Sequence, residues 1–242
     1  MRTLTNVELL DVWESGLSQT SVERALSLVA AAAPGVPVEE LARLSVGERD
    51  RRLFELRKAT FGEVLPMTTS CPRCNEQVEA NVPVDDLIVR AAAVAEDALE
   101  AEGVEVRFRL PNSIDLAAVA DEMSTEDAAL RLLVSCVVDA RRGGTALAVE
   151  ELPEAVIARI ADRMAELDPQ ADVELALTCP ACAQEWLALL DIGEFLWTEI
   201  QASAQRLLRD VHALARAYGW REPDVLALSA ARRQAYLEMI GA

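Results

Sequence analysis

Two short cysteine motifs are the strongest chemical feature of this sequence. The segments SCPRCNEQVEA, from Ser70, and TCPACAQEWLA, from Thr178, each contain a Cys-Pro-x-Cys unit, which we call a hook. Two residues between the cysteines allow a tight turn that directs both thiolates at one ion, and two such turns supply the four thiolates that zinc prefers in structural sites. We therefore predict one structural Zn²⁺, with the ligands Cys71, Cys74, Cys179 and Cys182.

Two alternatives to this zinc site stay open. A Cys-x-x-Cys unit is also typical of thioredoxin-like redox pairs, although its duplication here argues against that chemistry. Metal-free hooks are the other alternative. Glycine commonly follows the second cysteine of such a turn, whereas Asn75 and Ala183 stand there in this chain. Asparagine tolerates the left-handed backbone and alanine tolerates it poorly, so the second hook departs from the usual pattern.

No other residue pattern predicts catalysis. Four thiolates leave a zinc ion without the open position that a catalytic metal needs. The sequence shows no Ser/His/Asp arrangement, no Gly-rich phosphate loop and no paired-carboxylate signature. Cys136 lies in the apolar stretch RLLVSCVVDA and is expected to be a buried structural thiol, and His212 is expected on a helix face. We predict that the protein is not an enzyme.

The segments beside the hooks indicate how they are positioned. EVLPMTTS and EQVEANVPV flank the first hook, and DVELALT and QEWLALLDI flank the second, as short strands would. Each hook is therefore expected at the tip of a hairpin, with the metal joining the two tips. The chain between them is predicted to be a mostly helical insertion that the metal closes, with helices over 84–102, 114–123, 125–140 and 154–167 and strands after Gly103 and near Thr145.

The N-terminal region is predicted to be helical over 5–17, 20–33, 36–44 and 45–62, with a cap at Thr5 or Asn6 and an end at Gly62. The last of these helices is the one basic helix, and we expect its cations on a solvated or protein-docking face, with a nucleic-acid patch as the alternative. Those cations are Arg49, Arg51, Arg52, Arg57 and Lys58.

The C-terminal region, which we call the arm, is predicted to contain a helix from Ile192 that ends at Gly219 and a final helix capped by Ser229. An apolar stripe along the long helix is the predicted partner-binding surface, with an internal helical hairpin as the alternative. The stripe consists of Leu196, Ile200, Leu207, Val211, Leu214 and Tyr218. The whole chain is thus predicted to be mainly α with small β hairpins (α+β), divided into a helical region 1–62, a zinc-stapled core 63–190 and the arm 191–242.

Composition restricts the partners of this protein. The net charge of −18 repels phosphate backbones, so nucleic acid is not an expected partner. Glu76, Glu79 and Glu185 surround the hooks, which speaks against the alternative of a zinc-ribbon transcription-associated factor. No apolar run reaches the length of a membrane span, and the N-terminus lacks a signal-peptide pattern, so we expect a cytoplasmic protein.

A family resemblance joins these features. The segments VWESGL, RALSLVAAAAPG and GERDRRLFELRKATFG, both hooks and the C-terminal sequence from FLWTEI to YLEMI resemble zinc-knuckle accessory proteins encoded with contractile phage-tail-like injection systems. The C-terminal sequence also resembles that of T-even-type baseplate hub assembly chaperones. The resemblance implies a bacterial structural, assembly or baseplate accessory component whose partners are baseplate, hub or tape-measure proteins of such a particle.

Overall fold

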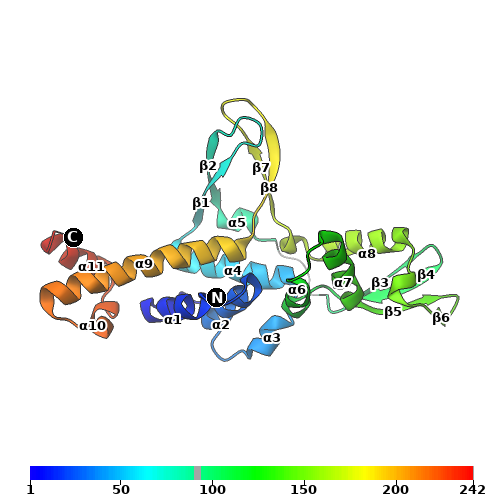
Figure 1. The fold of residues 1–242 in the computed structure, drawn as a ribbon, viewed down its shortest axis with the longest axis horizontal. Helices are drawn as coiled ribbons and strands as arrows, with labels where there is room; N and C mark the ends of the chain where they lie inside the picture. Colours follow the sequence, from blue (N-terminus) through cyan, green and yellow to red (C-terminus); the bar gives the residue numbers. More distant parts are fainter. Residues whose placement is uncertain (90–93, 242) are drawn as a thin grey trace.

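The computed structural model describes residues 1–89 and 94–241. It shows an elongated row of helices with a finger of paired strands rising near its middle (Figure 1). One end of the row is an insert of mixed helices and strands, and the other end is the arm, which carries the C-terminus. The prediction of a mainly helical α+β fold with small antiparallel hairpins is confirmed.

The central helical body begins with four N-terminal helices: α1 (Asn6–Gly16), α2 (Ser21–Ala32), α3 (Val38–Ala42) and α4 (Val46–Phe61). Thr5 and Thr20 cap α1 and α2, and in each case the carboxylate of a glutamate three residues on accepts from the backbone N–H of the cap, which completes a capping box. Gly62 ends α4 at a φ of 101°, a backbone conformation that glycine adopts without strain. These four predicted helices are confirmed.

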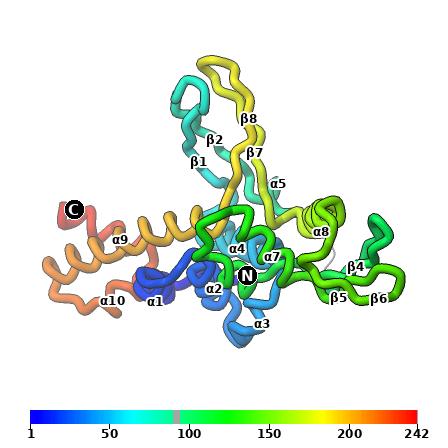
Figure 2. Tube along the Cα trace, turned by 45° about the vertical axis from the view of Figure 1, so that its right-hand side comes forward, coloured from blue at the N-terminus to red at the C-terminus, as the bar shows by residue number. Residues whose placement is uncertain are grey.

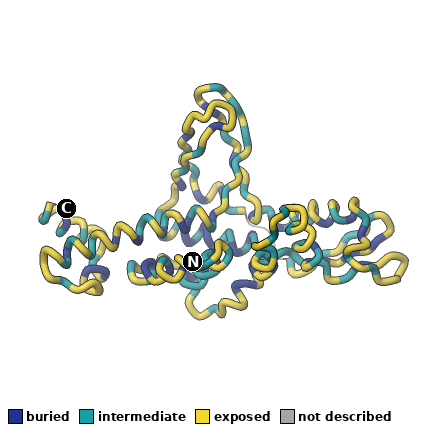
Figure 3. Tube along the Cα trace, viewed as in Figure 1, coloured by how far each residue is buried: buried dark blue, intermediate teal, exposed yellow. Residues whose placement is uncertain are grey.

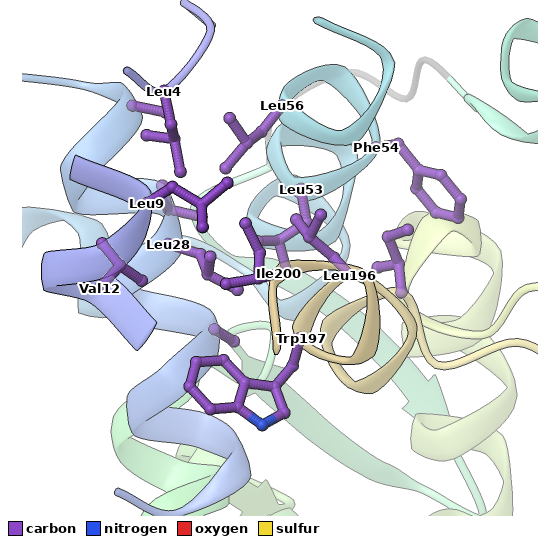
Figure 4. Packing of buried hydrophobic residues seen from close by; sticks show 14 of the residues in the cluster. Leu4, Leu9, Val12, Leu28, Leu53, Phe54, Leu56, Leu196, Trp197 and Ile200 are labelled. Atoms are coloured by element: carbon purple, nitrogen blue, oxygen red, sulfur yellow. The ribbon is translucent and has the colours of Figure 1, made fainter. Parts of the chain in front are cut away.

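The body is completed by the long helix α9 (Ile192–Tyr218). Figure 4 shows Leu196, Trp197 and Ile200 of α9 among the apolar side chains of α1, α2 and α4. The ring of Trp197 lies against Gly16, where a Cβ atom would overlap it, and Arg24 stacks over the same ring at 4.8 Å. Because this core unites residues from both ends of the sequence, it crosses the expected boundaries near residues 62 and 190.

The finger consists of two antiparallel hairpins, β1 (Val64–Ser70) with β2 (Gln77–Pro83) and β7 (Glu174–Thr178) with β8 (Glu185–Leu189). The two hairpins are not hydrogen-bonded to each other as one sheet. Figures 1 and 2 both show them standing side by side, with their tips together and their bases on the helical body. The predicted hairpins and the placement of the hooks at their tips are confirmed.

The insert between β2 and β7 differs from its prediction. It contains an antiparallel sheet in the order β3 (Asp97–Ala101), β4 (Val104–Phe108), β5 (Val137–Arg142), β6 (Thr145–Ala146). Its helices are α5 (Val84–Leu87), α6 (Ser113–Val119), α7 (Thr125–Cys136) and α8 (Glu154–Leu167), with short 3₁₀ turns η1 (Val149–Glu151) and η2 (Pro169–Ala171). Helices still outweigh strands in the insert, as expected, but the four-stranded sheet is larger than the two predicted strands.

Two helix predictions fail for identifiable reasons. The helix expected over 84–102 ends after Leu87, and residues 97–101 form β3 instead; residues 90–93 lie outside the described part of the chain. The helix expected over 125–140 ends at Cys136, because the next residues pair with β4 as β5. At 97–101 the pairing of strands outweighs the helical propensity of an alanine-rich sequence, whereas Val137 and Val138 at the start of β5 favour a strand by themselves.

The insert has a core of its own. Val104, Val106 and Phe108 of β4 pack with Val156 and Ile160 of α8, and this cluster is separate from the core of the helical body. The two parts meet where the buried Asp168 accepts a hydrogen bond of 2.9 Å from the N–H of Gly47, in the first turn of α4. The insert is thus folded around its own apolar residues and docked by polar contacts.

The arm ends in the two short helices α10 (Glu222–Leu226) and α11 (Ala230–Met239), which fold back against α9. Ser229 caps α11 and Gly219 ends α9 in the left-handed conformation, as predicted. Within the described residues, none of the helices combines the length and the apolar character that crossing a bilayer requires.

The apolar stripe of α9 is used inside the chain. Leu196, Ile200 and Leu207 belong to the core of the helical body, and Leu214 packs against α10 and α11. Val211 is half-buried between these two clusters. Tyr218 is the member that stays exposed, at 39%. The stripe therefore forms internal packing, as in the helical-hairpin alternative, and not the free partner-binding surface that the pattern predicts.

Candidate metal centre

The finger brings the four cysteines of the hooks together at its tip. The sulfurs of Cys71, Cys74, Cys179 and Cys182 all lie within 4.8 Å of one another. The two cross-hairpin distances are 3.7 Å from Cys71 Sγ to Cys182 Sγ and 3.6 Å from Cys74 Sγ to Cys179 Sγ. Sulfurs about 2.3 Å from a tetrahedrally bound ion lie about 3.8 Å apart. The cluster therefore has the geometry of a four-sulfur metal site.

The two hooks have the same backbone turn. In the first, Cys71 N donates to Glu76 O at 2.8 Å and Asn75 N donates to Cys71 O at 2.9 Å. The second hook repeats this pattern from Cys179 and Ala183, at 2.8 and 3.0 Å. Each turn needs a left-handed residue after its second cysteine, and φ is 60° at Asn75 and 56° at Ala183. The alanine thus adopts the conformation that the sequence made doubtful, which indicates that the tip geometry imposes it.

The surroundings of Cys71 and Cys74 shift the pKa values of their thiols in opposite directions. Burial disfavours the thiolate of Cys71, but hydrogen bonds from the backbone N–H groups of Cys74 and Arg73 outweigh it, and the pKa of Cys71 is lowered to about 7. At Cys74 the backbone N–H of Glu76 favours the thiolate, but contacts with the neighbouring thiols, Cys182 first, outweigh it and raise the pKa to about 12. Cys74 therefore keeps its proton at neutral pH, and binding of a metal ion would release it.

The tip has few other sources of stability. Its apolar cluster contains Cys71, Val78 and Cys179, with Cys182 and Trp186 half-buried beside them. This cluster is separate from the cores of the body and of the insert. Figure 3 shows the buried residues concentrated where the helices of the body meet and sparse along the finger. A metal ion bound by both tips would therefore stabilise the finger, which has little apolar packing of its own.

The basic helix does not form a cationic surface. Arg57 is 1% exposed and pairs with Glu199 of α9, and Arg49 is buried beside Asp50. The remaining cations of α4 pair with carboxylates: Arg51 with Glu48 and Glu55, Arg52 with Glu48, and Lys58 with Asp85. The expectation of a solvated or docking face is thus wrong for Arg49 and Arg57, which hold helices together. The apolar positions Leu53 and Phe54 are the sequence signal that part of this helix faces a core.

Two other residues that the sequence singled out lie apart from the cluster. Cys136 is fully buried in the insert, as predicted, and burial raises the pKa of its thiol. His212 is exposed on α9. Neither approaches the four sulfurs at the tip of the finger.

A comparison with family models gives the class of the protein. The model described as T4 bacteriophage base plate protein matches residues 18–197, which include most of the helical body, both hairpins of the finger and the insert. The chain belongs to this family. No match was found among curated proteins or among solved structures. The arm beyond residue 197 lies outside the match.

Proposed function

We propose that this baseplate-family protein is a non-catalytic structural or assembly component of a contractile phage-tail-like injection system. The family match over residues 18–197 is the observation that carries the proposal. It makes the chain a phage baseplate-related protein, and baseplate proteins act by contacting other proteins. The more specific role as an accessory component rests on the resemblance of the N-terminal segments, the hooks and the arm.

The metal of the tip is proposed to be a structural Zn²⁺. Four sulfur ligands with tetrahedral spacing suit zinc, and they leave no open coordination position for a substrate or for water. The tip is small and poorly packed, so the ion would supply the free energy that keeps the two hairpins joined. Under this proposal the metal maintains the shape of the finger and does not take part in a reaction.

The finger is the part that we propose to meet a partner protein. It projects from the body, and its charged residues are mainly acidic: Glu76, Glu79, Glu174 and Glu185 are exposed, against Arg73. Together with the net charge of −18, this supports protein partners over nucleic acid. Baseplate, hub and tape-measure proteins are the proposed partners. The protein is proposed to be made in the bacterial cytoplasm and to join the particle there.

Affinity purification from the native host tests this role. A tagged chain is isolated, and the free fraction and the particle fraction are each analysed by mass spectrometry. We expect baseplate, hub or tape-measure proteins in at least one fraction, and the fraction that contains the chain itself tells whether it stays in the finished particle. The same purification with Cys179→Ser and Cys182→Ser together tests the finger. Cys136→Ala is the matched control, since it removes a thiol far from the tip.

Two results would contradict the proposal. Recovery of nucleic acid and transcription proteins in place of particle proteins would favour the zinc-ribbon alternative. Unchanged recovery of particle proteins with the double cysteine variant, after its metal has been shown to be lost, would remove the finger from the proposed interface and leave the rest of the proposal standing.

A further inference from the structure

The arm contains a positively charged groove in an otherwise acidic protein. A cavity of about 490 Å³ lies between α9 and α11, and three arginines line it: Arg206, Arg209 and Arg233. Asp210 is the one carboxylate of its lining. The net charge of the chain is −18, so a groove with this excess of cations stands out from the rest of the surface.

Two of these arginines have no carboxylate partner. Arg233 Nε donates to Asp210 Oδ2 at 2.9 Å, so Asp210 is already paired. Among residues 1–89 and 94–241, Arg206 and Arg209 form no ion pair, and both are exposed. Elsewhere, arginines such as Arg57, Arg109 and Arg163 do pair with carboxylates. The groove thus retains two positive charges that the fold itself does not use.

The groove also presents free backbone donors. Ala230 and Ala231, which line it, are the first two residues of the ten-residue helix α11. Ser229 accepts through its hydroxyl from Arg232 N and through its carbonyl from Arg233 N. The N–H groups of Ala230 and Ala231 have no acceptor in the described part of the chain. Free N–H groups at a helix N-terminus favour an anion, and here they adjoin the arginines.

Arg233 itself has an unsatisfied donor inside the fold. Nη1 of Arg233 is buried and has no hydrogen-bond partner among the described residues. A buried N–H group of a cation without an acceptor costs free energy. Because protein atoms enclose Nη1, a ligand in the groove would meet Arg206 and Arg209, which are exposed. The two unpaired arginines and the adjoining N-terminus of α11 therefore both favour a negatively charged ligand in the groove.

We propose that this groove binds an acidic segment of a partner protein, through carboxylates that pair with Arg206 and Arg209. The guanidinium group matches a carboxylate in a two-point geometry. The lining residues of α9 run from Ser203 to Asp210, about 10 Å along the helix axis, which exceeds a single small anion and suits a short peptide. A nucleic acid would bring many more phosphates against a chain of net charge −18. The proposal concerns residues outside the family match and does not depend on the proposed baseplate role.

Binding of a defined peptide to the purified full-length protein tests this site. The probe is a fluorescein-labelled seven-residue peptide with glutamate at its first, fourth and last positions and alanine between them, and the control probe has glutamine in place of glutamate. Fluorescence anisotropy is measured at low and at physiological salt. Arg206→Glu with Arg209→Glu is the test variant. Arg216→Glu with Arg232→Glu is its control, because it changes the net charge of the arm equally at two residues that do not line the groove.

The glutamate peptide is expected to bind the wild-type protein and the control variant, and to bind the test variant about tenfold more weakly or worse. The glutamine peptide is expected not to bind. Arg206→Gln with Arg209→Gln repeats the test without charge reversal, and circular dichroism verifies that each variant is folded. Equal weakening in both double variants would overturn the proposal, because it would assign the effect to overall charge. Failure of the glutamate peptide to bind at low salt, or tighter arginine-dependent binding of a single-stranded oligonucleotide, would also overturn it.

Discussion

Arg57 of α4 and Glu199 of α9 form a two-point ion pair inside the helical body. Nη2 of Arg57 donates to Oε1 of Glu199 at 2.8 Å, and Nε donates to Oε2 at 3.0 Å. The remaining nitrogen, Nη1, donates to the carbonyl oxygens of Gly62 and Val64 at 2.9 and 2.6 Å. One buried guanidinium therefore joins the end of α4, the start of the finger and the long helix.

Replacing Glu199 with alanine should leave this guanidinium buried without its carboxylate. Removing one partner of a buried pair costs about 3–5 kcal/mol, and about 3 kcal/mol is expected here because Glu199 is 21% exposed and water can reach the vacated position. The measurement is the free energy of unfolding in urea. Glu166→Gln, which breaks the exposed pair with Arg163, serves as control and should leave the midpoint unchanged. Equal midpoints for both variants would show that the Arg57 pair contributes nothing.

Asp50 should make the stability of the protein depend on pH. Burial raises its pKa to about 6 against the pull of Arg49, and the charges of Asp191 and Asp168 add to the rise. The folded state then holds the proton more tightly than the unfolded chain, so ionisation of Asp50 costs stability as the pH rises from about 4 to about 6.

The variant Asp50→Asn has no such ionisation. Between pH 5 and pH 8, the wild-type protein should lose about 1 kcal/mol of unfolding free energy relative to this variant. The two proteins are compared by the slope of unfolding free energy against pH. Their absolute free energies differ in any case, because Asp50→Asn also loses the ion pair with Arg49. Asp121→Asn, at an exposed position, is the control and should follow the wild type. Parallel curves for wild type and Asp50→Asn would contradict the assignment.

The parts of the fold that the sequence predicts are those set by local chemistry. The caps at Thr5 and Ser229, the stop at Gly219 and the spacing within each hook determine structure over a few residues, and the structure agrees with them. The duplicated motif also places two distant hairpins together, because a shared metal site needs all four sulfurs. Long-range information of this kind is rare in a single sequence.

The sheet of the insert is harder to predict, because it depends on pairing between segments that are distant in the sequence. Residues 97–101 are rich in alanine and glutamate, which favour helix, yet they pair with β4 through the turn at Glu102 and Gly103. Both turn residues have positive φ, 53° and 69°, as in the two-residue hairpin turns that prefer glycine or asparagine. Glutamate at the first turn position hides this turn signal in the sequence.

The sequence also cannot distinguish the two roles of the α9 stripe, because its apolar pattern is the same whether the helix packs internally or on a partner.

Removal of the metal should loosen the finger and leave the rest of the protein folded. The purified protein is expected to contain about one zinc per chain, and Cys179→Ser should lose it. The tip cluster is separate from both larger cores, so hydrogen exchange should rise in 64–83 and 174–189 and remain slow in α2, α4 and α9. Cys136→Ala is the control and should keep its zinc. Absence of metal from freshly purified, reduced protein would contradict the site, and faster exchange throughout the insert would contradict the separation of the cores.

The stripe of α9 gives a last prediction, in which two of its residues should respond in opposite ways. Leu207 is 3% exposed within the core of the body, so Leu207→Asp would place a carboxylate among apolar side chains. Burying an unpaired charge destabilises the folded state strongly, so we expect a large fall in the melting temperature or aggregation. Tyr218 is 39% exposed and stacks on Trp220 at 4.8 Å between ring centroids, so Tyr218→Ser should lower stability by about 1 kcal/mol at most. Circular dichroism and calorimetry measure both variants, and zinc content shows whether the finger survives. If Leu207→Asp melts like the wild type, the stripe is not core in solution and its role as a partner surface must be reconsidered. If Tyr218→Ser stays folded and loses particle proteins in affinity purification, the exposed end of the stripe is the part that a partner contacts.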